Sequence, residues 1–230
     1  MKEKIYLIPG LMTDERLWSR VKPYLDEKYE LIHLPIPYSE DFDEINKILD
    51  KQITDEKINL LGFSLGGYLA TYYTVTFPNK VKRLFLLSST PSATEEKDIP
   101  RREKKLQEAR EGNFTLLDEK KAVELLEVKD DKQLVKLVCD MFNELGNETF
   151  ASQLALTLKR EELFTKLNEL KIPTYLYYSL EDRLLNHTSI KALEKIEHDF
   201  KINHRVGTSH NISLEVPKEF CKEIEQWMQI

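Results

Sequence analysis

The sequence predicts an α/β fold: a mostly parallel, doubly wound sheet of about six strands with a helical cap inserted into it. Short runs rich in β-branched and aromatic residues alternate along the chain with longer amphipathic stretches. Most of the short runs are apolar throughout, as expected of strands buried on both faces of a parallel sheet. One long span interrupts this alternation and contains no convincing strand. Together these features indicate a βαβ core with a helical insertion.

The elements of the core follow from the same patterns. We expect strands at Ile5–Ile8, Glu30–Leu34, Ile58–Phe63, Arg83–Ser88, Thr174–Ser179 and Lys201–Val206. We expect helices between them at about Glu15–Leu25, Phe42–Gln52, Leu65–Phe77, Ser189–His198 and Pro217–Met228.

The interruption defines the domain organisation. Residues 1–90 and 172–230 form the predicted core, and residues 91–171, called the insertion below, form the predicted helical cap. Charged amphipathic helices fill this span, and Gly112 and Gly146 punctuate it. The chain remains a single structural domain overall. An ordinary helical subdomain with no role at the active site is the alternative interpretation.

Composition narrows the classes of function. The net charge of −6 argues weakly against a nucleic-acid partner, and apolar runs such as "LFLL" are too short to span a bilayer. The charged start "MKEK" is followed by no long apolar region of the kind that a secretory leader needs. Cys139 and Cys221 lie far apart in helical contexts, which favours a reducing compartment without disulfides. We therefore expect a cytoplasmic protein that binds neither membrane nor nucleic acid.

Residues 61–70, "LGFSLGGYLA", carry the clearest chemical signal. Gly62-Phe63-Ser64-Leu65-Gly66 fits the pattern Gly-x-Ser-x-Gly between an apolar strand and a helix. Such a turn is too tight for side chains at the two glycine positions, and it exposes the serine at the positive end of the helix. Ser64 is therefore a candidate nucleophile. A glycine-rich connection shaped only for packing is the alternative.

A serine hydroxyl needs a base to take its proton, and five histidines are available. Only His210 lies in a polar loop, "GTSHNIS", directly after the last predicted strand, where open α/β sheets build their sites. The other four are predicted to lie within or at the ends of strands and helices, at His33, His187, His198 and His204. We predict that His210 is the base; a surface-loop histidine is the alternative.

The base in turn needs an anion that fixes its tautomer. Asp182, in "YSLEDRLL", lies just beyond the fifth predicted strand. Its neighbour Glu181 is a competitor, and a helix cap or an ion pair with Arg183 is the structural alternative for Asp182. The tetrahedral intermediate requires backbone donors as well. We expect these from the amides of Leu65 and Leu11, the latter in the glycine-containing loop "IPGLMTD".

With these residues in place, the chain resembles the α/β-hydrolase superfamily over nearly its whole length. The order Ser64, Asp182, His210 matches the order of nucleophile, acid and base in that family. "SHNISLEVPKEF" resembles the stretch around the catalytic histidine, and "SLED" resembles the acid turn, although serines stand where glycine is commoner. The resemblance implies hydrolysis through an acyl-enzyme, with no metal and no organic cofactor. It also implies six strands rather than eight, because the chain starts at the third strand of the family.

The loop "IPGLMTDERLW" resembles the oxyanion loop of small bacterial members of the superfamily. Pro9 stands where many relatives have histidine, which leaves donation by the backbone intact. The serine at the nucleophile position argues against haloalkane dehalogenases and epoxide hydrolases, which use aspartate there.

The substrate signal is weaker. "RREKKLQEAR" places a basic cluster at the start of the insertion, at Arg101, Arg102, Lys104, Lys105 and Arg110. A solvated helix face is the simple interpretation. A docking patch for an acidic acyl-carrier protein is the sharper one, and the superfamily includes carrier-protein methyl ester esterases.

Aromatic and methionine side chains are candidates for an acyl pocket, although at helical spacing they are more often core. The substrate-binding candidates are Met12, Phe63, Met141 and Phe142. The leading hypothesis is a serine hydrolase acting on a carboxylic ester or thioester with an acyl chain. The alternatives are a C–C hydrolase or lyase with the same triad, and a non-catalytic ligand-binding protein.

Overall fold

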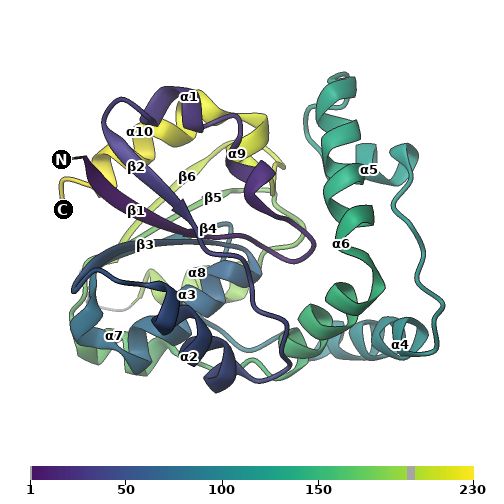
Figure 1. The fold of residues 1–230 in the computed structure, drawn as a ribbon, viewed down its shortest axis with the longest axis horizontal. Helices are drawn as coiled ribbons and strands as arrows, with labels where there is room; N and C mark the ends of the chain where they lie inside the picture. The colour runs from purple at the N-terminus through teal and green to yellow at the C-terminus, as the bar shows by residue number, and fades with distance from the viewer. Residues whose placement is uncertain (1, 196–199) are drawn as a thin grey trace.

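The computed structural model describes residues 2–195 and 200–230, and a parallel six-stranded sheet lies at the centre of this part (Figure 1). The strand order is β2-β1-β3-β4-β5-β6. The strands are β1 (Glu3–Ile8), β2 (Tyr29–His33), β3 (Ile58–Phe63), β4 (Val81–Leu87), β5 (Thr174–Ser179) and β6 (Phe200–Arg205). The predicted fold class is confirmed, and the predicted strands agree with the observed ones to within two residues.

Helices cover both faces of the sheet (Figure 1). One face carries η1 (Glu15–Trp18), α1 (Lys22–Leu25), α9 (Ile212–Glu215) and α10 (Pro217–Trp227). The other face carries α2 (Phe42–Gln52), α3 (Leu65–Thr76), α7 (Phe164–Leu170) and α8 (His187–Leu193). The short turn η2 (Pro78–Lys80) leads from α3 into β4.

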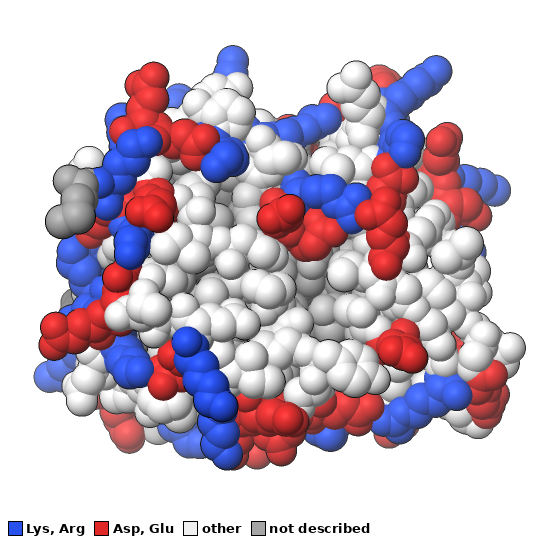
Figure 2. Space-filling model, viewed as in Figure 1, with Lys and Arg blue, Asp and Glu red and all other residues white. Residues whose placement is uncertain are grey.

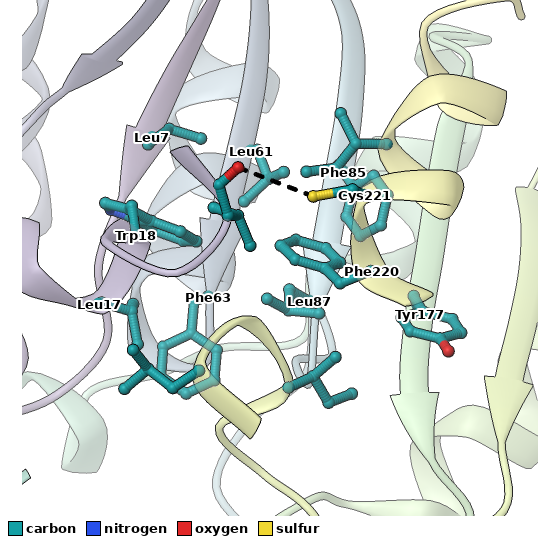
Figure 3. Packing of buried hydrophobic residues seen from close by; sticks show 14 of the residues in the cluster. Leu7, Leu17, Trp18, Leu61, Phe63, Phe85, Leu87, Tyr177, Phe220 and Cys221 are labelled. Atoms are coloured by element: carbon teal, nitrogen blue, oxygen red, sulfur yellow. Dashed lines mark hydrogen bonds between the residues drawn. The ribbon is translucent and has the colours of Figure 1, made fainter. Parts of the chain in front are cut away.

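The alternation of side chains along each strand supplies two cores, one on each face. In β1, Ile5 and Leu7 face the α10 side, whereas Tyr6 and Ile8 face the α3 side. Figure 3 shows the first core, where rings and aliphatic side chains from the sheet meet α10. Phe85 is central to it, because its ring contacts the rings of Tyr175, Phe220 and Trp227 at 5.0, 5.7 and 5.4 Å.

Cys139 and Cys221 are both buried, and both are free thiols. The Sγ of Cys221 donates to the carbonyl oxygen of Val21 at 3.8 Å (Figure 3). Burial raises the pKa of Cys221 to about 12, so this thiol stays protonated at neutral pH and serves the core.

Two predicted helices differ from the observed ones. The stretch 15–25 is not one helix but η1 followed by the single turn α1, because Pro23 has no N–H to donate to the carbonyl of Ser19. The helix expected at Ser189–His198 begins earlier, at His187, where the side chain of Asn186 accepts from the Ser189 amide and caps it. Residues 196–199, which include His198, lie outside the described residues.

All secondary-structure elements of the insertion are helices. Residues 91–171 are all described and contain no strand. They form η3 (Glu96–Asp98), α4 (Ile99–Arg110), α5 (Glu119–Leu125), α6 (Lys132–Leu158) and α7. Gly146, with φ of 72°, kinks α6, and the C-terminal end of α4 passes into Gly112 with φ of 82°. The helices α4, α5 and α6 stand beside the core, while α7 packs against α3 (Figure 1).

No described helix is both long enough and apolar enough to cross a membrane.

In the sheet, the order of strands reverses between β1 and β3, so the loops that follow these two strands run in opposite directions away from a crevice at their carboxyl ends. These are the loops that contain Leu11 and Ser64.

The turn between β3 and α3 generates a stability prediction. A Cβ on Gly66 would lie 2.1 Å from the carbonyl oxygen of Pro9 and 2.4 Å from that of Ile8, and backbone cannot rotate away. A Cβ on Gly112 would meet nothing within 4 Å and would suffer only the positive φ. We expect Gly112→Ala to cost about 1–2 kcal/mol, or a few degrees in melting temperature. Gly66→Ala should lower the melting temperature by far more or prevent folding, and equal effects in thermal unfolding would contradict the argument.

Candidate active site

Ser64 lies at the turn between β3 and α3 in a conformation that few residues adopt. Its φ of 51° and ψ of −116° place it outside the ordinary allowed regions, and such strain is typical of functional turns. Hydrogen bonds from both sides hold this backbone in place. The Ser64 amide donates to the carbonyl of Leu87 at 3.0 Å, while the Ser64 carbonyl accepts from Ser89 Oγ at 2.7 Å and from the Gly67 amide at 3.0 Å.

The glycines around Ser64 permit a close approach of backbone to backbone. A Cβ on Gly62 would lie 2.2 Å from the carbonyl oxygen of Gly66, and one on Gly67 would lie 2.4 Å from the Cβ of Ser89. The turn therefore packs directly against the backbone after β1 and against Ser89 after β4. The hydroxyl of Ser64 stands at the N-terminus of α3, where the helix dipole favours negative charge.

The structure brings His210 and Asp182 to this hydroxyl. Nε2 of His210 lies 3.0 Å from Oγ of Ser64, and Nδ1 of His210 lies 2.6 Å from Oδ2 of Asp182. Asp182 is 1% exposed and His210 8% exposed. A carboxylate only accepts hydrogen bonds, so Nδ1 carries the proton and Nε2 is free to accept one from Ser64. The three side chains thus form one continuous chain of hydrogen bonds.

Local hydrogen bonds fix the turns that carry the carboxylate and the imidazole. The second carboxylate oxygen of Asp182 accepts from the Leu184 amide at 2.9 Å. The carbonyl of His210 accepts from Ser88 Oγ at 3.0 Å, and the ring of Phe63 packs against the imidazole with centroids 5.0 Å apart. Ser179, where the resemblance favours glycine, uses its hydroxyl to donate to the Ser209 carbonyl at 2.6 Å.

The insertion holds the histidine loop through Glu127, which lies between α5 and α6. Its carboxylate accepts two hydrogen bonds from the guanidinium of Arg205, both at 2.9 Å, and one each from the amides of Thr208 and Ser209. The hydrogen bonds from Arg205 and these amides lower the pKa of Glu127 to about 2. Three residues that precede His210 are therefore bound to a side chain of the insertion.

Glu215, at the end of α9 in the core, also binds both the insertion and the histidine loop. Its carboxylate accepts from the amides of Glu127 and Val128 at 2.6 and 2.8 Å and from Ser209 Oγ at 2.5 Å. Glu215 thus binds the backbone of the segment that contains Glu127, and both glutamates bind Ser209, the residue before His210.

The predicted oxyanion donors, Leu11 and Leu65, both line a cavity beside Ser64. Within the described residues, neither amide N–H has a hydrogen-bond acceptor. The neighbouring amides of the first loop are occupied: Gly10 donates to Thr13 Oγ1 and Met12 to Gln153 Oε1, each at 2.8 Å. The loop is thus held in place while the Leu11 amide remains available.

The cavity has a volume of about 90 Å³ and is unusually polar. Its lining includes hydroxyl side chains from the segment after β4 and two arginines of the insertion, namely Ser88, Ser89, Thr90, Ser92, Arg102 and Arg160. A larger, open hollow of about 850 Å³ lies at the opposite end of the sheet, lined by charged residues such as Lys4, Glu30 and Asp55. Because parallel sheets build their sites at the carboxyl ends of the strands, the smaller cavity is the candidate site.

The predicted substrate-binding residues do not line this cavity. Met12, Phe63 and Met141 are at most 2% exposed, and Phe142 stacks on Phe114 with ring centroids 5.5 Å apart. Their role as an acyl pocket stays a prediction.

The residues of the predicted docking cluster differ in their exposure to solvent. Arg101, Lys104 and Lys105 are exposed, whereas Arg102 is half-buried and lines the cavity. On the face in Figure 2, acidic and basic side chains are interspersed rather than gathered by sign. No group of three histidine, cysteine, aspartate or glutamate side chains suited to a metal ion occurs among the described residues.

Sequence reasoning missed Glu127, Gln153 and Arg160. Each lies in the insertion, far in sequence from the residue it contacts, and none belongs to a motif.

The Glu127 contacts predict a pH-dependent stability. Because the folded-state pKa of Glu127 is lowered from 4.5 to about 2, its contribution is present at neutral pH and is lost as the pH falls through that interval. We expect Glu127→Gln to lower the melting temperature at pH 7. The difference from the unmodified protein should narrow as the pH is lowered from about 4.5 towards 2. A constant difference across this range would show that the charge of Glu127 is not responsible.

Comparison with known proteins places this geometry in context. A family model described as the alpha/beta hydrolase fold matches residues 34–215. A pimeloyl-[acyl-carrier protein] methyl ester esterase from Wigglesworthia glossinidia brevipalpis is 28% identical over 246 residues, which cover 98% of this chain and 93% of the relative. A protein of the same name from Legionella pneumophila (strain Corby) is 31% identical over 101 residues, 42% of either chain.

Solved structures show the same fold. The enol-lactonase from Burkholderia xenovorans LB400 superposes with a TM-score of 0.84 at 15% identity, covering 100% of this chain and 92% of that one. MenH from S. aureus superposes with a TM-score of 0.79 at 21% identity, covering 99% and 93%. The matched family span contains Ser64, Asp182 and His210, and the sheet has the same architecture. The chain belongs to the alpha/beta hydrolase family.

Proposed function

We propose that this protein is a serine hydrolase that cleaves a carboxylic ester or thioester through an acyl-enzyme. The observation that carries the proposal is the continuous hydrogen-bond chain from Asp182 through His210 to Ser64. Membership of the hydrolase family and the esterase names of the relatives support it.

In the first step, Ser64 Oγ attacks the carbonyl carbon of the substrate while Nε2 of His210 takes the hydroxyl proton. The imidazolium that forms is stabilised by the carboxylate of Asp182, 2.6 Å from Nδ1. Burial of both groups keeps water from competing for this hydrogen bond. The strained backbone of Ser64 holds the oxygen in place before the substrate arrives.

The carbonyl oxygen becomes negatively charged in the tetrahedral intermediate. The amides of Leu65 and Leu11 are the proposed donors to it, and the N-terminus of α3 adds a favourable field. His210 then gives its proton to the leaving alcohol or thiol, and the acyl group remains on Ser64. In the second half, His210 takes a proton from water as the water attacks the acyl carbon. The bond to Ser64 Oγ then breaks, His210 returns the proton to that oxygen, and the acid leaves.

The finer proposal is that the acyl group is delivered on a carrier protein. The relatives named as pimeloyl-[acyl-carrier protein] methyl ester esterases support it, one of them over 98% of the chain. On α4, Lys104 and Lys105 are exposed; Lys104 is 3.9 Å from Glu108, and Lys105 has no ion-pair partner among the described residues. Arg101 is paired with Asp98 at 3.0 Å, so the lysines are the better candidates for docking an acidic carrier.

Removal of the nucleophile tests the reaction class. We expect Ser64→Ala to abolish labelling by a fluorophosphonate probe and to reduce ester hydrolysis roughly 10⁴- to 10⁶-fold, because the proton chain acts only through this oxygen. The measurement is in-gel labelling together with hydrolysis of a short 4-nitrophenyl ester. Folded protein without labelling at Ser64 would contradict the proposal.

The carrier hypothesis has its own test. A panel of short 4-nitrophenyl esters, long-chain esters and acyl-carrier-protein methyl esters should show the highest kcat/KM for the last. We expect Lys104→Gln combined with Lys105→Gln to raise KM for the carrier-linked ester severalfold and to leave the 4-nitrophenyl esters unaffected, since only the former needs docking. Equal changes for all substrates would argue against docking on α4.

A further inference from the structure

Two arginines lie beside Ser64 without an acidic partner. Arg102 on α4 and Arg160 after α6 line the same cavity as Ser64, Leu11 and Leu65. Neither guanidinium has a carboxylate within 4 Å among the described residues, although the chain forms many ion pairs elsewhere. The Nε atoms of both arginines are buried and lack an acceptor in the described part of the chain. Two such cations in one small cavity are costly unless an anion joins them.

The acidic residues around the cavity do not fill this role. Glu95 and Asp98 also line it, but Glu95 is paired with Lys97 at 3.1 Å and Asp98 with Arg101 at 3.0 Å. Both carboxylates lie more than 4 Å from either guanidinium group, although Asp98 attracts Arg102 over a longer distance. The two guanidinium groups therefore still lack a directly bound carboxylate.

The two arginines differ in how firmly they are bound. Arg160 donates from one terminal nitrogen to the Thr90 carbonyl at 2.7 Å and lies over the ring of Tyr68 at 4.3 Å. Burial lowers the pKa of Arg160 to about 10, with the charge of Arg102 contributing, so it stays protonated at neutral pH. The guanidinium of Arg102 makes no hydrogen bond to any described residue. Its guanidinium is free to bind a ligand.

The remaining lining supplies neutral donors. The hydroxyls of Thr90 and Ser92 lie 2.7 Å apart and share one hydrogen bond, which leaves one hydroxyl proton for a ligand. The side-chain N–H groups of Asn186 have no acceptor among the described residues, whereas the Thr94 hydroxyl already donates to the Thr157 carbonyl. A planar carboxylate can accept from a guanidinium in two parallel hydrogen bonds and from such hydroxyls as well. The volume of about 90 Å³ suits a small anionic group rather than a long acyl chain.

We propose that this cavity is a carboxylate-binding subsite, formed by Arg102 and Arg160, and that the natural substrate carries a free carboxylate close to the carbonyl that Ser64 attacks. The inference rests on the proposed hydrolase function and not on the carrier-linked methyl ester, because that ester has no free carboxylate. It names the class of substrate: a half-ester or half-thioester of a dicarboxylic acid. Water cleaves the C–O or C–S bond of the esterified end, which gives the dicarboxylate and an alcohol or thiol.

Matched methyl esters test the preference. Monomethyl glutarate carries the anion, while methyl hexanoate and dimethyl glutarate have similar length without charge. We expect kcat/KM for monomethyl glutarate to exceed that for either neutral ester at least about tenfold, as charge-assisted hydrogen bonds to the substrate imply. Arg102→Gln should lower kcat/KM for monomethyl glutarate to the level of the neutral esters measured with the same variant. Lys120→Gln, which removes an exposed positive charge from the same insertion, should retain the advantage.

A binding measurement keeps the proposal testable whatever the turnover. In the Ser64→Ala protein, increasing glutarate concentrations should raise the melting temperature progressively, and dimethyl glutarate should not. Adding Arg102→Gln should abolish the shift. Stabilisation by inorganic phosphate but not by glutarate would overturn the carboxylate assignment in favour of a phosphate site. No shift with either anion, or equal kcat/KM for charged and neutral esters, would overturn the subsite altogether.

The two proposals fail separately. If glutarate binds through Arg102 but Ser64 is not labelled by a fluorophosphonate, the anion site stands and the hydrolase function falls. If Ser64 is labelled but no anion preference appears, the hydrolase stands and the subsite falls.

Discussion

The hydrogen bond between Asp182 and His210 is the interaction on which the site depends. It joins two loops that are far apart in sequence, and it is nearly removed from solvent on both sides. Without the carboxylate, the imidazole would lose the partner that fixes its tautomer and turns Nε2 towards Ser64. The parallel sheet supplies the constraint behind this contact, because it places the loops after β3, β5 and β6 at one edge.

The insertion contributes to both ends of the site. Through Glu127 it binds the residues that precede His210, and through Gln153 it binds the loop that presents Leu11. It also supplies the two cavity arginines, Arg102 and Arg160. The helical insertion thus holds the loops that carry Leu11 and His210 and also lines the cavity beside Ser64, so substitutions in it are expected to change rate and specificity together.

Much of this arrangement was accessible from sequence, for definite physical reasons. Apolar strands and the glycines around Ser64 left strong local signals, because a fully buried strand and a tight turn each restrict residue types. The order of Ser64, Asp182 and His210 added a global constraint. The prediction of one continuous helix over residues 15–25 was wrong, because it did not take account of Pro23, which interrupts the helical hydrogen bonds. The contacts of Glu127 and the inward turn of Arg102 depend on tertiary packing of the insertion, which has no local signature.

The central claim is that Ser64, His210 and Asp182 act as one unit, and a comparison of single and double variants tests it most directly. The measurement is kcat on one ester for Ser64→Ala, for His210→Ala and for the protein with both changes. Residues that act as a unit lose little more when the second is removed, so the account predicts that the double variant is about as slow as either single one. If the two losses instead multiply, the side chains act independently, and the proposed proton chain is contradicted.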